Sequence, residues 1–189
     1  MSRGVATRRS IIVGIVRIAC GRADGIGCFA SSAQGFLSSL APLIAFPLVG
    51  AALGAFSDGP RRALTGFAMT LCALLTPAVV SYELARVWKR AEGWLRFATA
   101  FNWCEWILPV LACLIMVPLS VAISFGLSED TASLALLGCL GVYGLWLHWF
   151  LARNALALSR LRATVLVLLV NFCTVVVVMG PRLLVHIAG

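Results

Sequence analysis

The segment RVWKRAEGWLRFATAFNWCE, residues 86–105, determines how the rest of the chain is arranged. It lies between two long uncharged stretches and carries four cations, Arg86, Lys89, Arg90 and Arg96. A segment with this many charges does not cross a bilayer, and basic residues beside a membrane-spanning helix are held on the cytoplasmic side. The sequence therefore predicts an interfacial, cytoplasmic position for this segment, which orients the spans on either side.

The composition identifies an integral membrane protein. Of the 189 residues, 61% are hydrophobic and 12% are charged, whereas a soluble domain has about 25% charged residues. The mean hydropathy is +1.01. No loop is long enough to bury a core of its own. The predicted fold class is all-α membrane, with five transmembrane helices in one bundle and an N-terminal interfacial amphipathic helix.

The charge and the cysteine content argue against nucleic acid and metal ions as ligands. The formal net charge is +8, but the cations flank apolar spans, where orientation and attraction to anionic headgroups explain them without nucleic acid. The seven cysteines include no C-x-x-C pair, and most of them lie in apolar runs, where a thiol behaves as a small hydrophobe. We expect neither a metal site nor a disulfide framework.

The chain divides into a cytoplasmic N-terminal arm, residues 1–35, and a five-span transmembrane domain, residues 36–189. In the arm, Arg17 interrupts an apolar run too early for a cleaved signal peptide. The apolar positions around it share one helical face, which is typical of a helix in the membrane interface. A frayed tail is the alternative. Residues 21–35 are rich in Gly, Ser and Ala and are predicted to be a linker.

Five stretches are uncharged over about 20 residues, enough to cross a hydrocarbon core. They comprise residues 36–56, 63–82, 106–128, 131 to just before Arg153, and 163–181. Of the 15 Lys and Arg residues, this arrangement puts twelve on the N-terminal side and three on the other. The bias predicts a bacterial cytoplasmic membrane protein with its N-terminus in the cytoplasm and its C-terminus outside.

Four ionisable residues at the ends of three spans are the main functional candidates, because such groups are rare beside a membrane. They are Glu83, Glu105, His148 and Arg153, which one inner layer would bring together as a polar pocket for a headgroup, a proton or a partner's side chain. The favoured alternative is structural: Glu83 pairs with Arg86, Glu105 pairs with a neighbouring arginine, and His148 lies among aromatic rings.

The predicted midplane holds no charge, which argues against an ion or proton pathway. Asn171 is the one strongly polar residue near the centre, and a hydrogen bond from Thr76 would make it structural. Gly50 and Gly54 form a G-x-x-x-G motif that permits close helix packing. We favour packing within the chain over self-association, and Gly54→Leu should then obstruct the approach of a neighbouring helix.

No motif indicates cofactor chemistry. His148 is predicted near the inner face and His186 beyond the outer face, so the two imidazoles cannot ligate one haem. The sequence contains no Gly-rich phosphate loop, no G-x-S-x-G nucleophile elbow and no H-E-x-x-H. We therefore expect no cofactor and no enzymatic activity.

The layout resembles that of the Ypt-interacting-protein (Yip) domain family of small membrane proteins. The stretches GFLSSLAPLIAFP (35–47), FNWCEW (101–106) and WLHWFLAR (146–153) are similar to those of bacterial Yip-like proteins. The D-L-Y-G-P signature of eukaryotic members is missing, and SDGP (57–60) does not replace it. The resemblance thus implies about five spans, but neither a small-GTPase partnership nor catalytic residues.

Together these features favour a non-enzymatic polytopic protein that binds or organises membrane proteins or lipids. Its expected partners are membrane lipids, other membrane proteins or further copies of the chain, and not nucleic acid. A small oligomeric permease is the alternative, and a lipid-modifying enzyme using Glu105 and His148 is less favoured. A permease needs a hydrated cavity that reaches the midplane, and an enzyme needs a lateral pocket in the inner leaflet. The binding interpretation requires neither.

Overall fold

The computed structural model describes the backbone of residues 2–57 and 59–188 and the side chains of residues 10–57 and 59–180. The predictions that concern the side chains of Arg3, Arg8, Arg9, Arg182 and His186 lie outside these residues. All regular structure in the described part is helical: α1 (Ser2–Ala19), η1 (Ala23–Cys28), α2 (Ala33–Ser57), α3 (Pro60–Val87), η2 (Ala91–Gly93), α4 (Trp94–Cys104), α5 (Ile107–Ser124), α6 (Glu129–Ala155) and α7 (Arg160–Ala188).

Five helical segments are long and apolar enough to cross a membrane. They are α2, α3, the segment Ala91–Ser124 that contains α4 and α5, α6, and α7 as far as Gly180. Such segments satisfy their backbone hydrogen bonds internally, as the hydrocarbon core requires. The predicted all-α membrane class and the number of spans are confirmed.

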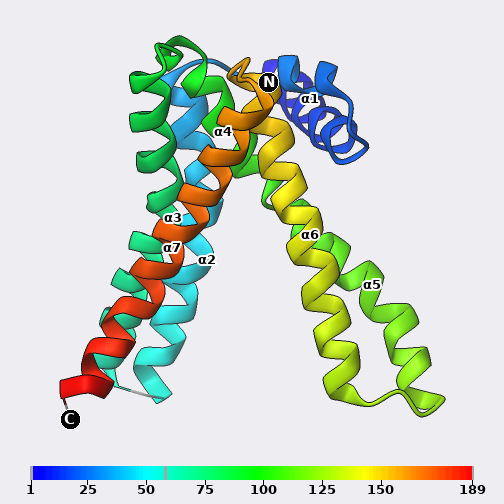
Figure 1. Cartoon of the computed structure of the whole chain (residues 1–189), viewed down its shortest axis with the longest axis vertical. Coiled ribbons are helices and arrows are strands. Elements are labelled where there is room, and N and C mark those ends of the chain that lie inside the picture. Colours follow the sequence, from blue (N-terminus) through cyan, green and yellow to red (C-terminus); the bar gives the residue numbers. More distant parts are fainter. Residues whose placement is uncertain (1, 58, 189) are drawn as a thin grey trace.

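The spanning helices form an inverted V in Figure 1. Helices α2, α3 and α7 run side by side as a three-helix group, with α3 in contact with both α2 and α7. Helices α5 and α6 pack together as a two-helix group that diverges from the first. Helix α4 contacts α2, α3 and α6, and α6 contacts α7. The bundle is therefore closed at one end, where the groups meet, and splayed at the other.

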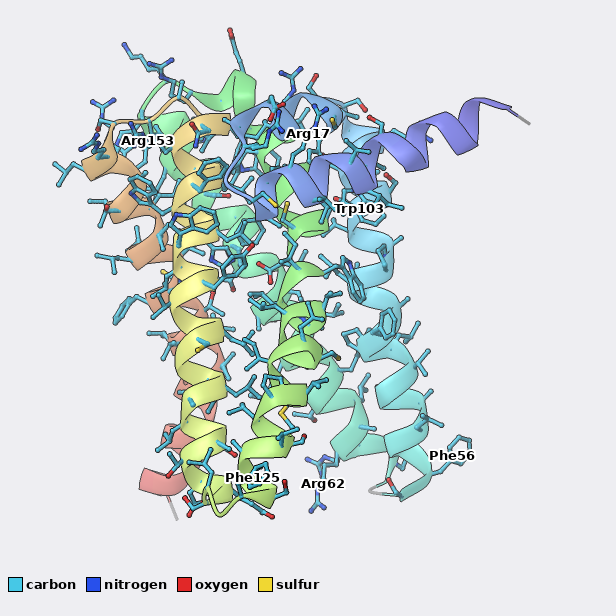
Figure 2. All side chains as sticks on the ribbon, turned by 90° about the vertical axis from the view of Figure 1, so that its right-hand side faces the viewer. Arg17, Phe56, Arg62, Trp103, Phe125 and Arg153 are labelled. Atoms are coloured by element: carbon cyan, nitrogen blue, oxygen red, sulfur yellow. The ribbon has the colours of Figure 1, made fainter. Side chains whose placement is uncertain are left out.

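Cations gather at the closed end, which we call the basic end. Arg17 and Arg153 lie there, whereas Arg62 lies at the opposite end, beside the loops that join the spans (Figure 2). The closed end also contains the end of α3, the turn that follows it, the start of α4 and the start of α7, which together carry Arg86, Lys89, Arg90, Arg96, Arg160 and Arg162.

Helix α1 lies across the basic end, beside the spans (Figures 1 and 2). Ile18 is fully buried, whereas Ile12 is 62% exposed and Val16 is 56% exposed. The hydroxyl of Tyr143 in α6 donates a hydrogen bond to the carbonyl oxygen of Ala19, at 3.1 Å. One side of α1 is thus attached to the bundle, and an apolar side remains free, as in a helix at a membrane interface.

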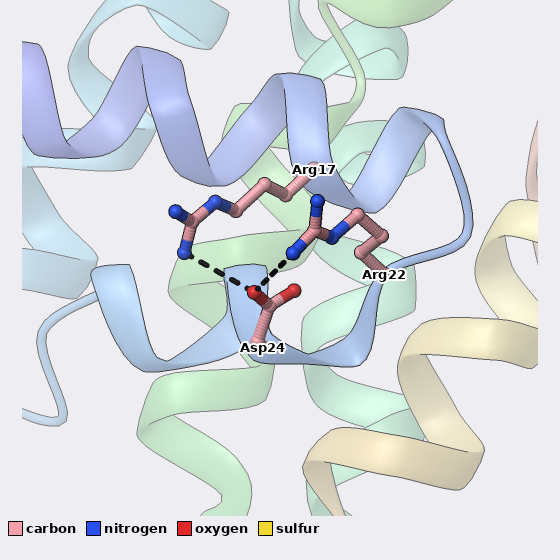
Figure 3. A network of polar contacts seen from close by, with 3 residues as sticks. All are labelled: Arg17, Arg22 and Asp24. Carbon is pink, nitrogen blue, oxygen red and sulfur yellow. Dashed lines mark hydrogen bonds and ion pairs between the residues drawn. The ribbon is translucent and has the colours of Figure 1, made fainter.

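The linker predicted for residues 21–35 is wrong over Ala23–Cys28, which form the 3-10 helix η1. Arg17 of α1 and Arg22 both contact the carboxylate of Asp24, each at 3.2 Å (Figure 3). Ile26 and Phe29 are buried in the same core as the spans. The small and polar residues here form close packing and ion pairs. A composition typical of linkers is therefore compatible with an ordered segment.

The packing of α1 against η1 requires two glycines. A Cβ atom added to Gly14 would lie 2.8 Å from the Cβ of Cys28, and one added to Gly25 would lie 2.7 Å from the carbonyl oxygen of Gly14. Real Cβ atoms essentially never approach so closely. The two backbones therefore touch at a site where any larger residue would force them apart.

Helix α4 is buried, whereas the sequence predicted that residues 86–105 would lie on the surface of the bundle among headgroups. Arg86, Lys89 and Arg90 are exposed as expected, but α4 is buried on most of its surface. Its packing against α1, α2, α3 and α6 explains the difference, because neighbours on all sides replace the headgroup layer. The segment is a core element, and it positions the residues that follow.

Candidate functional site

A cavity of about 310 Å³ lies just inside the basic end, where α4 meets the two helix groups. Its walls are formed by α2, α3, α4, α6 and α7, and they are mainly apolar. Six polar residues line it: Thr70, Asn102, Glu105, His148, Asn171 and Thr174. We call it the apex cavity.

The two ionisable residues that line the cavity, Glu105 and His148, contact each other. Nε2 of His148, in α6, lies 2.8 Å from Oε1 of Glu105, in the turn between α4 and α5. The two side chains are 17% and 29% exposed. The ring of Phe101 packs on the imidazole, with centroids 4.6 Å apart. A hydrogen-bonded, partly buried pair therefore closes the basic end of the cavity.

The pair lies about two helical turns inside the basic end. His148 is about two turns before the end of α6 at Ala155, about 10 Å along the helix axis. Asn171, at the other end of the cavity, is about three turns into α7, about 16 Å from Arg160. The cavity therefore reaches about 16 Å inward from the start of α7, about half the thickness of a hydrocarbon core of about 30 Å.

The surroundings of His148 indicate where its proton lies. Nδ1 is buried and has no hydrogen-bond partner among the described residues. A proton on Nδ1 would be a stranded donor, both in the imidazolium and in the tautomer that accepts from a protonated Glu105. We therefore place the imidazole proton on Nε2, which donates to Oε1 of Glu105.

The carboxylate of Glu105 is incompletely compensated. Oε1 accepts from His148, whereas Oε2 accepts no hydrogen bond from the described residues. No Lys or Arg belongs to the cavity lining. Removing a charge from water is unfavourable unless a partner is present, so the free oxygen is the position where a ligand would be most strongly attracted.

The structure does not bring the four predicted rim residues together. Glu83 pairs with Arg86 at 2.8 Å on the exposed surface of α3, as the structural alternative predicted. Arg153 lies over the ring of Trp149, 5.3 Å from its centroid. Neither Glu83 nor Arg153 lines the apex cavity. The predicted pairing of Glu105 with an arginine is wrong, because α4 turns its carboxylate inward to α6.

Asn171 and Thr76 do not form the predicted interhelical hydrogen bond. The amide nitrogen of Asn171 donates to the carbonyl oxygen of Val167, 2.8 Å away in its own helix. The hydroxyl of Thr76 likewise bonds within α3, to Cys72. Both side chains are satisfied locally, which leaves the carbonyl oxygen of the Asn171 amide available to the cavity that it lines.

The predicted packing motif lies on the wall of a second, outer cavity of about 420 Å³ between α2 and α3. No atom lies within 4 Å of a Cβ added to Gly50, and one added to Gly54 would have the Cβ of Ala63 as its nearest neighbour, at 4.0 Å. The two glycines therefore border a groove and do not contact a tightly packed helix. Thr70 lines both cavities.

Sequence reasoning missed Asn102, which lines the apex cavity and is buried. Its amide nitrogen donates to the hydroxyl of Ser39 in α2, at 2.9 Å, and so connects α4 to the three-helix group. A strongly polar residue within the apolar run 97–104 was a usable signal. The expectation that this run lies in the headgroup layer concealed it.

Among residues 10–57 and 59–180, no three His, Cys, Asp or Glu side chains gather as metal ligands would. Comparison of the chain with protein-family models, with curated proteins and with solved structures found no match.

Proposed function

We propose that this chain is a non-enzymatic polytopic membrane protein that binds a membrane-soluble amphiphile in the apex cavity. The observation that carries the proposal is the polarity of the cavity, which is charged at its basic end and apolar along its walls. Ligand sites typically combine an apolar lining with a few convergent polar groups, in volumes of about 300–1,000 Å³.

The location of the polar groups favours an amphiphile over a fully polar ligand. Glu105 and His148 lie about 10 Å from the end of α6, below the layer where headgroups are hydrated. A molecule that brings an apolar chain with it can reach this depth from within the bilayer. The predicted association with membrane lipids would then be the binding of an amphiphile inside the bundle.

A small permease is the second candidate. The apex cavity extends to Asn171, and Thr70 lines both this cavity and the outer one. The outer cavity reaches Arg62, at the end opposite the basic end. Two adjoining cavities of this kind are the feature that a permease requires, and transport by wild-type protein in vesicles would distinguish it from binding alone.

The proposal also covers the membrane in which the protein lies, its orientation there and its family. The concentration of cations at the basic end supports a cytoplasmic N-terminus in a bacterial inner membrane, with the C-terminus outside. The five spans and the short loops support a relationship to bacterial Yip-like proteins. Other membrane proteins or further copies of this chain remain candidate partners for the apolar outer surfaces.

The proposed function is tested by filling the cavity. Ala73→Phe places a phenyl group in the lining, and Cys72→Phe places the same group on the adjacent exposed position of α3. Both variants and wild-type protein would be purified in detergent and analysed by native mass spectrometry for retained amphiphiles. We expect retention by wild type and Cys72→Phe and loss in Ala73→Phe. Equal retention by all three would refute an interior site.

A further inference from the structure

We propose that the apex cavity selects an amphiphile with a primary ammonium head. This inference rests on the proposed function and adds the chemistry of the ligand. Its structural basis is Glu105, which we take as a carboxylate and whose Oε2 accepts no hydrogen bond from the described residues.

The polar groups of the cavity offer mainly acceptors. The hydroxyls of Thr70 and Thr174 donate to Gly66 and Val170 of their own helices, so their free lone pairs remain. The amide nitrogens of Asn102 and Asn171 each donate one hydrogen within the protein, and each retains a second. The proton on Nε2 of His148 is engaged by Glu105. A head that supplies several donors therefore fits better than one that needs them.

The charge of the cavity lining also favours an ammonium head. A carboxylate at Glu105 beside a neutral imidazole gives the lining a net charge of about −1, because no Lys or Arg lines the cavity. A phosphate or carboxylate head would place a second negative charge beside the first, without a cation to offset either. An ammonium head neutralises the carboxylate and donates to it, and such charge-assisted hydrogen bonds are the stronger kind.

The walls require that this cation carry an apolar group. Leu43, Leu74, Pro77 and Val170 line the cavity together with the ring of Phe101. A hydrated metal ion would leave these surfaces without contacts, whereas an alkyl chain covers them. The face of an aromatic ring also attracts a cation. A primary ammonium can come from a free lipophilic amine or from the headgroup of an aminophospholipid, and the chemistry at Glu105 is the same.

The test compares four amphiphiles with identical chains in phosphatidylcholine nanodiscs: dodecylamine, dodecanol, dodecyltrimethylammonium and dodecanoate. Binding would be measured for wild type, Glu105→Gln and Glu83→Gln, which removes an exposed carboxylate from the same end. Comparing variants cancels simple partitioning into the bilayer. For dodecylamine we expect Glu105→Gln to weaken binding about ten- to hundredfold and Glu83→Gln to leave it unchanged. In wild type, dodecylamine should bind most tightly.

The rank order in wild-type protein tests the inference even if Glu105→Gln does not accumulate. Tightest binding by dodecanol, by the quaternary ammonium or by dodecanoate would overturn the ammonium inference and keep the proposed function. If sodium ions from added sodium chloride displaced dodecylamine, the site would be one for a metal cation, and the ammonium inference would be overturned as well. Failure of all four amphiphiles to bind would refute the proposed function itself. Repeating the dodecylamine titration in phosphatidylethanolamine nanodiscs identifies the source, because an aminophospholipid ligand would compete.

Discussion

Two polar contacts of equal length, each made by a glutamate, differ in their exposure to solvent, and this difference has a measurable consequence. The Glu105–His148 and Glu83–Arg86 contacts are both 2.8 Å long. The side chains of the first pair are 29% and 17% exposed, and those of the second are 50% and 65% exposed. Double-mutant cycles with alanine at each position would give the coupling energy of each pair.

The expected magnitudes follow from exposure. A hydrogen bond to a charged group contributes about 1.5–3 kcal/mol where water is largely excluded, and the partial access of Glu105 to the cavity places its coupling with His148 near the lower value. Solvent screens the exposed pair, for which helical neighbours typically contribute about 0.3–0.5 kcal/mol. We therefore expect the inner coupling to exceed the outer one by about 1 kcal/mol.

The assay is reversible unfolding in mixed detergent and sodium dodecyl sulfate micelles, followed by tryptophan fluorescence. The cycle cancels the loss of packing that each single substitution causes, including the loss of the contact between His148 and Phe101. Equal coupling energies for the two pairs would refute the reasoning, because burial would then have no effect on contacts of equal length. A larger value for the exposed pair would refute it more strongly.

Three further results are expected. A topology reporter fused after Gly189 should read periplasmic and one inserted within residues 92–95 cytoplasmic, and matching signals would contradict the five-span arrangement. Gly14→Ala should destabilise the protein by about 1–3 kcal/mol in the same unfolding assay, because its Cβ would lie 2.8 Å from another atom, whereas Gly141→Ala, with no atom within 4 Å, should be neutral or stabilising. Gly54→Leu, expected from sequence to obstruct packing, should change thermal stability little because the nearest atom is 4.0 Å away. A large loss of melting temperature would restore the packing interpretation.

Local features of this chain were predictable from sequence. Uncharged stretches long enough to cross a bilayer identified all five spanning segments, because a helix satisfies its backbone within the segment itself. The contact between Glu83 and Arg86 was predicted from its i,i+3 spacing alone. In both cases the deciding interactions join residues that are neighbours in the chain.

The burial of α4 was not predictable in the same way. Its basic and aromatic residues are typical of a headgroup layer, and that interpretation holds for the exposed Lys89 and Arg90. Further along, Phe97 and Cys104 are in the core because helices from distant parts of the chain surround them. The residues 21–35 were misread for a similar reason, since the neighbour that orders η1 is α1.

Sequence alone determined the membrane class, the number of spans and the position of the cations, because each depends on the solvent that a short segment prefers. Tertiary structure alone decided the site. Glu105 and His148 are 43 residues apart, and Asn102 and Ser39 are 63 residues apart. Whether such residues meet depends on the rotation and tilt of packed helices. Apolar residues face lipid as readily as they face one another, so the hydrophobic pattern of a spanning helix does not specify which side is turned inward.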